Sequence, residues 1–176
     1  NLSEDEVFEW RNRGIGGSDI NALFGTDINI QALYKEKIGK KIRKSNGKLQ
    51  FHMRVKDFIA EEFKLKTGME LRRKNAILRH KEHPFLIANV DRLIHGQEAG
   101  LLCKATSNKD FISDKNLLYP LQLRCQHYMA VTGAIRWWVG LLVGGVQFHY
   151  FYVDRNEDTI QQIIRKSEVF WNKIQK

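Results

Sequence analysis

Two short apolar stretches decide the fold: HPFLIANVDRLI at residues 83–94 and GLLCKAT at residues 100–106. Each run has the length and composition that are typical of a buried β-strand. The turn HGQEAG at residues 95–100 is compact enough to join the two runs as a hairpin. The two runs contain a single acidic residue, Asp91. We therefore expect strands of a sheet in the middle third of the chain.

The segments on both sides of this hairpin favour helices and further strands. Aromatic and β-branched residues in the stretch 135–154 predict two strands that turn at Gly144 and Gly145. There is no internal repeat, low-complexity tract or linker, so we expect residues 1–176 to form a single α/β domain. Helical spacing of apolar residues predicts helices at 3–13, 50–66, 119–132 and 157–173.

The charge balance favours a partner that carries phosphate groups. Lys and Arg outnumber Asp and Glu by 29 to 20, which gives a net charge of +9. Seven basic residues and one acid lie between Lys35 and Lys48. This run is either a contact to the DNA backbone, which carries no sequence information, or a solvated loop. The candidate backbone contacts are Lys40, Lys41, Arg43 and Lys44.

The cysteines and the apolar runs limit the classes of protein to be considered. Cys103 and Cys125 have neither the spacing of a disulfide framework nor a CxxC motif, so no zinc site is indicated. The longest apolar run, WWVGLLVGGVQF at residues 137–148, is too short for a membrane span. We therefore expect a protein of the cytoplasm with no membrane partner.

Four strings, in this order, carry a resemblance to a known family. Together they resemble the YqaJ-type viral recombinases, relatives of phage lambda exonuclease within the PD-(D/E)xK nuclease fold. The resemblance implies a central mixed sheet flanked by helices, and a magnesium-dependent enzyme that digests linear duplex DNA from 5′ to 3′. It also implies a phage protein that acts in the bacterial host beside a single-strand annealing protein, and self-association as a trimer. The strings are WRNRGIGGSDI at 10–20, HPFLIANVDRLI at 83–94, QHYMAVTG at 126–133 and EVFWNKI at 168–174.

The family pattern of metal ligands is only partly present. Mg²⁺ requires oxygen ligands in octahedral geometry, and it polarises the phosphoryl oxygen and activates the attacking water. The resemblance implies a Glu on the long helix, an Asp at a strand end, a Glu-x-Lys on the next strand and a Gln on the following helix. Asp91 matches the aspartate, and Lys56 stands where the helix glutamate is expected. Asp57 is adjacent, but one residue along a helix is about 100° around it.

The string GLLCKAT allows two alignments with the Glu-x-Lys, and neither restores an acid. Without a gap, Cys103 replaces the glutamate and Ala105 replaces the lysine. With a shift of one residue, Leu102 replaces the glutamate and Lys104 keeps the role of the lysine.

On the following helix, Arg124 occupies the position of the glutamine, with Gln122 and Gln126 as alternatives. Replacing carboxylates and adding cations removes the negative charge that a dication needs, so the resemblance implies an impaired magnesium site, or a protein with no cofactor. The alternative is a rearranged site that uses another acid. The acids available for it are Glu61, Glu62 and Glu98.

The glycine turn GIGGSD at residues 14–19 is the candidate site for a 5′-terminal phosphate. The resemblance implies that Arg11 and Ser18 hold this phosphate. A guanidinium, a hydroxyl and the backbone amides of Gly16 and Gly17 at a helix start form a reasonable anion site. The alternative is that Ser18 caps the helix and that Arg11 is a surface residue.

Two functions of different classes therefore fit the sequence. The first is a binding protein that has kept the nuclease fold, lost cleavage, and holds DNA ends, a processing complex or a host protein. A phage inhibitor of a host defence belongs to the same class. The second is a working Mg²⁺-dependent exonuclease with a rearranged site. We favour the first because of Lys56, Arg124 and the missing acid in GLLCKAT.

Overall fold

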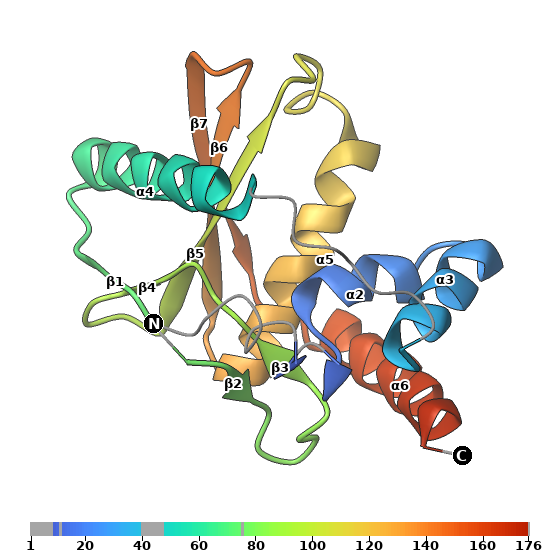
Figure 1. The fold of residues 1–176 in the computed structure, drawn as a ribbon. Coiled ribbons are helices and arrows are strands. Elements are labelled where there is room, and N and C mark those ends of the chain that lie inside the picture. The colour runs from blue at the N-terminus through green and yellow to red at the C-terminus, as the bar shows by residue number, and fades with distance from the viewer. Residues whose placement is uncertain (1–8, 11, 40–47, 75, 176) are drawn as a thin grey trace.

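A computed structural model of the chain describes residues 9–10, 12–39, 48–74 and 76–175, and describes only the backbone of residues 48 and 49. Helices come first in the described residues, followed by a series of strands, one helix, two long strands and a last helix (Figure 1). The helices are α2 (Gly17–Leu23), α3 (Asp27–Lys37), α4 (Lys48–Thr67), α5 (Lys115–Thr132) and α6 (Glu157–Ile174). The strands are β1 (Leu71–Arg72), β2 (Leu78–Arg79), β3 (Ile87–Ala88), β4 (Arg92–Ile94), β5 (Ala99–Thr106), β6 (Arg136–Val143) and β7 (Gln147–Asp154).

Five strands form a mixed sheet in the order β1-β4-β5-β6-β7. β4 and β5 are the expected hairpin, with Leu93 paired to Gly100. β6 and β7 are the second expected hairpin. β5 runs parallel to β6 along its whole length, and α5 provides the crossover that a parallel pair requires. The prediction of a mixed sheet flanked by helices is confirmed.

Helices cover both faces of this sheet (Figure 1). α4 packs on one face against a cluster that contains Leu101 and Cys103 of β5. α5, α2 and α6 pack on the other face, where Leu102 is part of the larger core cluster. Because successive strand residues point to opposite faces, β5 is in contact with helices on both sides. No helix in the described part of the chain is long and apolar enough to cross a bilayer.

Gly100 is required by its contact with Trp137, which is fully buried. A Cβ atom at position 100 would lie 2.2 Å from Cζ2 of the Trp137 ring. The indole therefore occupies the space that a side chain on β5 would need. Trp138 points to the opposite face, where its ring centroid is 5.5 Å from that of Phe63 on α4.

The structure corrects one predicted helix start and the alternative in which Ser18 caps a helix. Gly16 is the N-cap of α2, so Ser18 lies inside the helix and does not cap it. α5 begins at Lys115 rather than near residue 119, because the side chain of Asp114 accepts a hydrogen bond from the backbone N–H of Asn116 and caps the helix. Most of the predicted helix at 3–13 and most of the basic run lie outside the described residues.

His127 connects α5 to the small β2–β3 sheet in the interior. It is fully buried, and its Nε2 lies 2.8 Å from the backbone oxygen of Ile87 on β3. Burial lowers the pKa of His127 to about 4. The neutral imidazole donates through Nε2, so protonation of the second nitrogen would place a charge in the core.

This burial predicts a loss of stability in acid. The pKa of an unfolded histidine is about 6.5, so the stabilisation by neutral His127 is complete above that pH and is lost as the pH falls towards 4. Substituting His127→Gln removes this titration. Between pH 7 and pH 4.5, the variant should lose about 2 kcal/mol less unfolding free energy than the unmodified protein in urea titrations. Exposed His52 provides the control, and an equal loss in His127→Gln would contradict the assignment.

Candidate functional site

Asp91 immediately precedes β4, and its orientation is fixed by β5. Its side chain is 6% exposed. Oδ2 accepts a hydrogen bond of 2.8 Å from the backbone N–H of Cys103. The hairpin thus positions the carboxylate through the backbone of the neighbouring strand, independently of the side chain at position 103.

Lys56 reaches the same carboxylate from α4. Its Nζ lies 2.6 Å from Oδ1 of Asp91. Ile59 and Phe63, both fully buried, anchor α4 on the sheet and thereby bring Lys56 to this point. Both oxygens of Asp91 are therefore engaged by groups of the protein itself.

Two further cations, Lys104 on β5 and Arg124 on α5, interact electrostatically with this site. Lys104 is half-buried, and burial, together with the charges of Arg124 and Lys56, lowers its pKa. Arg124 on α5 interacts electrostatically with Asp91, and its Nε donates a hydrogen bond of 2.7 Å to the hydroxyl of Tyr128. Lys56 contacts the carboxylate of Asp91, Arg124 interacts with it electrostatically, and Lys104 lies near both of these cations.

The donor set at this point does not fit Mg²⁺. The ion needs several oxygen ligands, whereas Asp91 contributes one carboxylate that is already paired with an ammonium group. Leu102 is fully buried in the core, and burial raises the pKa of the Cys103 thiol, so neither supplies a ligand. Among the described residues there is no group of three or more His, Cys, Asp or Glu side chains that could hold a metal.

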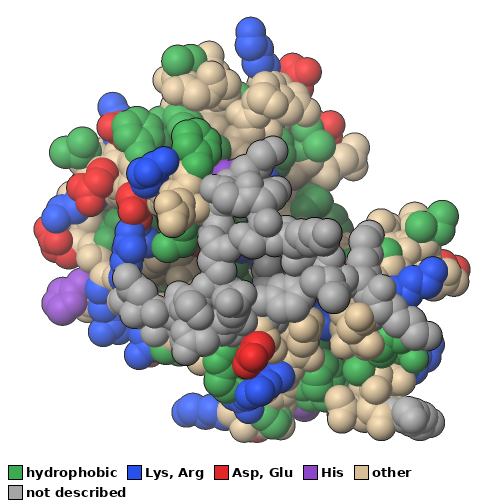
Figure 2. All heavy atoms as spheres, in the orientation of Figure 1, with side chains coloured by type: hydrophobic (Ala, Val, Ile, Leu, Met, Phe, Trp, Pro, Cys, Tyr) green, Lys and Arg blue, Asp and Glu red, His purple; other side chains and the backbone are tan. Residues whose placement is uncertain are grey.

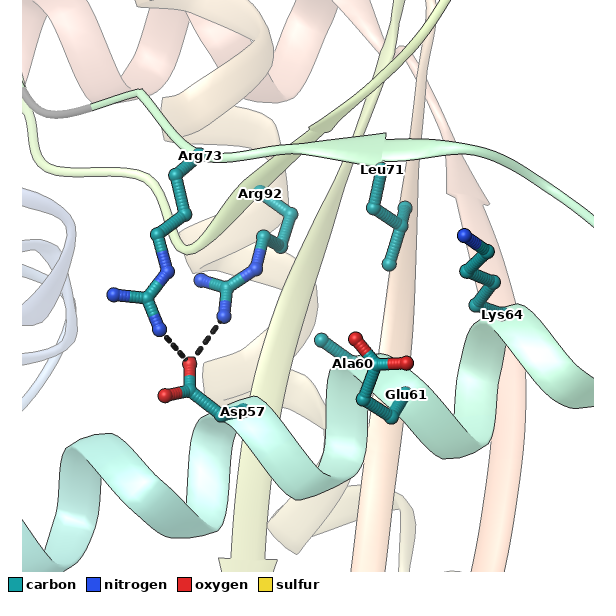
Figure 3. A pocket seen from close by; sticks show the side chains of 7 residues that line it. All are labelled: Asp57, Ala60, Glu61, Lys64, Leu71, Arg73 and Arg92. Atoms are coloured by element: carbon teal, nitrogen blue, oxygen red, sulfur yellow. Dashed lines mark hydrogen bonds and ion pairs between the residues drawn. The ribbon is translucent and has the colours of Figure 1, made fainter.

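Asp57 does not replace the missing helix carboxylate. Its Oδ1 accepts hydrogen bonds from Arg73 and Arg92, as the dashed lines in Figure 3 show. Although burial acts in the opposite direction, these bonds lower the pKa of Asp57. The carboxylate is therefore held at a separate cluster and does not contact Asp91.

This cluster lines a pocket of about 400 Å³ between α4 and strands β1 and β4 (Figure 3). Glu61 lies in the same pocket, and Glu98 lies in the exposed turn before β5. Arg92 also donates from Nη1 to the backbone oxygen of Asp91 at 2.6 Å, which links the pocket to the candidate site. Arg73, Arg92 and Tyr128 match no motif in the sequence; adjacency to Asp91 pointed to Arg92, and no local signal pointed to the other two.

The two glutamines of α5 do not occupy the position of Arg124. Gln126 is buried, donates from Nε2 to the backbone oxygen of Asp154 at 2.8 Å, and accepts from the backbone N–H of Asn156 at 2.9 Å. Gln122 is exposed. Arg124 is thus the residue that α5 contributes to the site.

The glycine turn lies beside the same site. A Cβ atom at Gly17 would lie 2.7 Å from Cε1 of Tyr128 and 3.0 Å from Cγ of Arg124. The backbone N–H of Gly16 donates to Oδ2 of Asp19 at 2.8 Å, and Asp19 forms a buried ion pair of 2.6 Å with Lys37. The amide of Gly16 is therefore already engaged. Phosphate binding by Ser18 stays a prediction, and the other predicted contacts, Arg11, Lys40, Lys41, Arg43 and Lys44, lie outside the described residues.

Comparison with solved structures gives the class of fold. An alkaline exonuclease (LHK-Exo) from Laribacter hongkongensis superposes with a TM-score of 0.83 at 15% identity, over 97% of this chain and 92% of that chain. The same enzyme in complex with dAMP superposes with a TM-score of 0.78. A phage-related exonuclease from Haemophilus somnus 129PT gives 0.71 at 9% identity, over 96% and 97% of the two chains. The chain has the fold of these exonucleases.

Comparison of sequences gives the family. Residues 6–135 match the YqaJ-like viral recombinase domain. The uncharacterized protein YqaJ of Bacillus subtilis (strain 168) is 34% identical over 179 residues, which cover 97% of this chain and 56% of that protein. The chain belongs to the YqaJ-like viral recombinase family, and it spans about half the length of this relative.

The geometry of the Lys56–Asp91 pair predicts strong energetic coupling. A double-mutant cycle of Lys56→Met and Asp91→Asn, followed by urea unfolding, should give a coupling of about 1–3 kcal/mol, because the carboxylate is buried. The exposed pair Arg136–Asp154 is the matched control and should couple by less than about 1 kcal/mol. Equal coupling in the two cycles would show that burial adds nothing to the pair at the site.

Proposed function

We propose that this chain is a DNA-binding member of its family that does not hydrolyse DNA. The observation that carries the proposal is the ammonium group of Lys56, which lies 2.6 Å from Asp91. In the family pattern implied by the sequence, this point on the long helix carries a second carboxylate. A lysine there contributes a positive charge where the metal would have to bind.

The positive side chains around Asp91 act together because each of them repels a metal ion. A dication near Asp91 would face the charges of Lys56, Lys104 and Arg124. The dication could not bind until Lys56 had left the carboxylate of Asp91. The single negative charge of Asp91 would then have to neutralise the two positive charges of the ion and the charges of the neighbouring cations.

The same charges favour a phosphate group. Three cations and one carboxylate leave a net charge of +2 at the site, and the whole chain carries +9. Phosphates of duplex DNA bind such clusters through Lys and Arg side chains, which position the duplex without reading its sequence. A structural neighbour that binds dAMP has the same fold, which supports a nucleotide ligand.

The first prediction concerns binding without metal. Fluorescence anisotropy with a 5′-phosphorylated linear duplex should give the same affinity in EDTA and in Mg²⁺ at matched ionic strength. Substituting Lys104→Gln should weaken binding and lower the slope of log K against log salt by about 1, because one phosphate contact is lost. Lys173→Gln on α6 removes the same charge elsewhere and should leave the slope unchanged. A requirement for Mg²⁺ would contradict metal-free binding.

The second prediction concerns the loss of catalysis. The unmodified protein should leave linear duplex DNA intact in Mg²⁺ and in Mn²⁺. The triple variant Lys56→Glu, Leu102→Glu and Arg124→Gln restores the family pattern in the shifted alignment, so Mg²⁺ should bind it and raise its melting temperature. A parallel triple with Cys103→Glu in place of Leu102→Glu tests the ungapped alignment.

Two controls make the outcome decisive. Adding Asp91→Asn to each triple variant should abolish the response to Mg²⁺, since the one carboxylate that the unmodified site provides is lost. Digestion of DNA by the unmodified protein that disappears in Asp91→Asn would overturn the loss of catalysis and would establish an exonuclease with a rearranged site.

A further inference from the structure

The pocket of about 400 Å³ between α4 and strands β1 and β4 brings two guanidinium groups to one point (Figure 3). Arg92 belongs to β4, and Arg73 directly follows β1, the strand paired with β4. Both side chains point at Asp57 on α4, and the Nη2 atom of each donates to Oδ1 of that carboxylate. Two cations from neighbouring strands therefore converge on a single oxygen atom.

These guanidinium groups offer more hydrogen-bond donors than Asp57 can use. A guanidinium carries five N–H donors in a planar fork that matches the geometry of a phosphate. Oδ1 of Asp57 accepts from one nitrogen of each group, and Arg92 also donates from Nη1 to the backbone oxygen of Asp91. Within the described residues, these three bonds leave N–H groups of both side chains for the oxygen atoms of a further anion.

Asp57 is the member of the cluster that can move aside. Its side chain is 42% exposed and that of Arg73 is 40% exposed, whereas that of Arg92 is 12% exposed. Although burial acts in the opposite direction, the hydrogen bonds from both arginines lower the pKa of Asp57, so the carboxylate is charged at neutral pH. A charged and partly exposed carboxylate can turn into water, and it then leaves the two guanidinium groups to another oxyanion.

We infer that this pocket binds a backbone phosphate of DNA, and that Asp57 is the group which the phosphate displaces. A phosphate oxygen takes the place of Oδ1 between Arg73 and Arg92, and the carboxylate turns outward. The inference rests on the DNA binding proposed above and adds a second contact beside the one at Asp91. Arg92 connects the two contacts, because its Nη1 donates to the backbone oxygen of Asp91.

The surroundings of the cluster fit one phosphate of a DNA strand. Ala60 and Leu71 give the pocket an apolar side, against which the deoxyribose next to a bound phosphate can pack. Figure 2 shows Lys and Arg side chains among Asp and Glu side chains on the surface over α4 and β1, at the left of the view. On a surface of mixed charge, a phosphate is held only where basic groups converge, as Arg73 and Arg92 do.

Removing the competing carboxylate tests the inference. In fluorescence anisotropy with the 5′-phosphorylated linear duplex, Asp57→Asn should bind about tenfold more tightly than the unmodified protein, because no anion has to leave the guanidinium groups. Asp154→Asn is the matched control, since it removes the same charge from an arginine pair, Arg136–Asp154, at the opposite edge of the sheet. This control should change the affinity by about twofold or less. No gain in Asp57→Asn, or an equal gain in the control, would overturn the inference.

Substitutions of Arg73 test the phosphate contact itself. Arg73→Gln should lower the slope of log K against log salt by about 1, whereas Arg73→Lys keeps the charge and should retain most of the slope. Combining Arg73→Gln with Asp57→Asn should abolish most of the gain in affinity, since both residues act on the same ligand. A full gain in the double variant would contradict phosphate binding between the two arginines.

Two comparisons separate this inference from the proposed function. A lower slope in Lys104→Gln but not in Arg73→Gln would overturn the contact in the pocket and leave DNA binding at Asp91 intact. The absence of any binding to the duplex would overturn both. In NMR spectra, the Nε–Hε signals of Arg73 and Arg92 should shift when the duplex is added. Shifts with inorganic phosphate and none with the duplex would assign the pocket to a small phosphate ligand and overturn the DNA contact.

Discussion

The parallel pairing of β5 with β6 is the constraint on which the arrangement of the site depends. Eight consecutive pairs join the two strands, from Ala99–Arg136 to Thr106–Val143. Parallel neighbours need a crossover, and α5 makes it across one face, while α4 covers the other. Because β5 is covered on both sides, groups from two helices approach Asp91 from opposite directions. Lys56 arrives from α4, and Arg124 arrives from α5.

At this site the backbone geometry matches the fold of exonucleases, whereas the charges of the side chains do not match a metal site. The hairpin still holds the carboxylate of Asp91 through the amide of Cys103, and the fold superposes closely on that of exonucleases. The surrounding side chains carry the opposite charge from the one that a metal site requires. These side chains are compatible with a well-packed core. The ammonium group of Lys56 is partly exposed to water, and Leu102 fills its buried position with apolar atoms. A fold therefore limits, but does not determine, what its site binds.

Local periodicity was sufficient to predict the two hairpins, the long helix α4 and the last helix, because each buries a continuous face that repeats along the chain. The start of α5 was missed because the capping by Asp114 outweighs an apolar pattern that begins later. At the site, counting along motifs identified Asp91, Lys56 and Arg124 individually. Their contacts, and the Asp57–Arg73–Arg92 cluster, join residues far apart in the sequence, so only the packing of α4 on the sheet reveals them.

Trp137 connects the interior of the sheet to the surface at Arg124. Its buried indole lies against Tyr128, with ring centroids 5.2 Å apart, and the hydroxyl of Tyr128 accepts the hydrogen bond of Arg124. A ligand that draws Arg124 towards itself changes the immediate surroundings of that indole. Any ligand that contacts Arg124 would therefore act, through Tyr128, on the surroundings of a tryptophan in the interior.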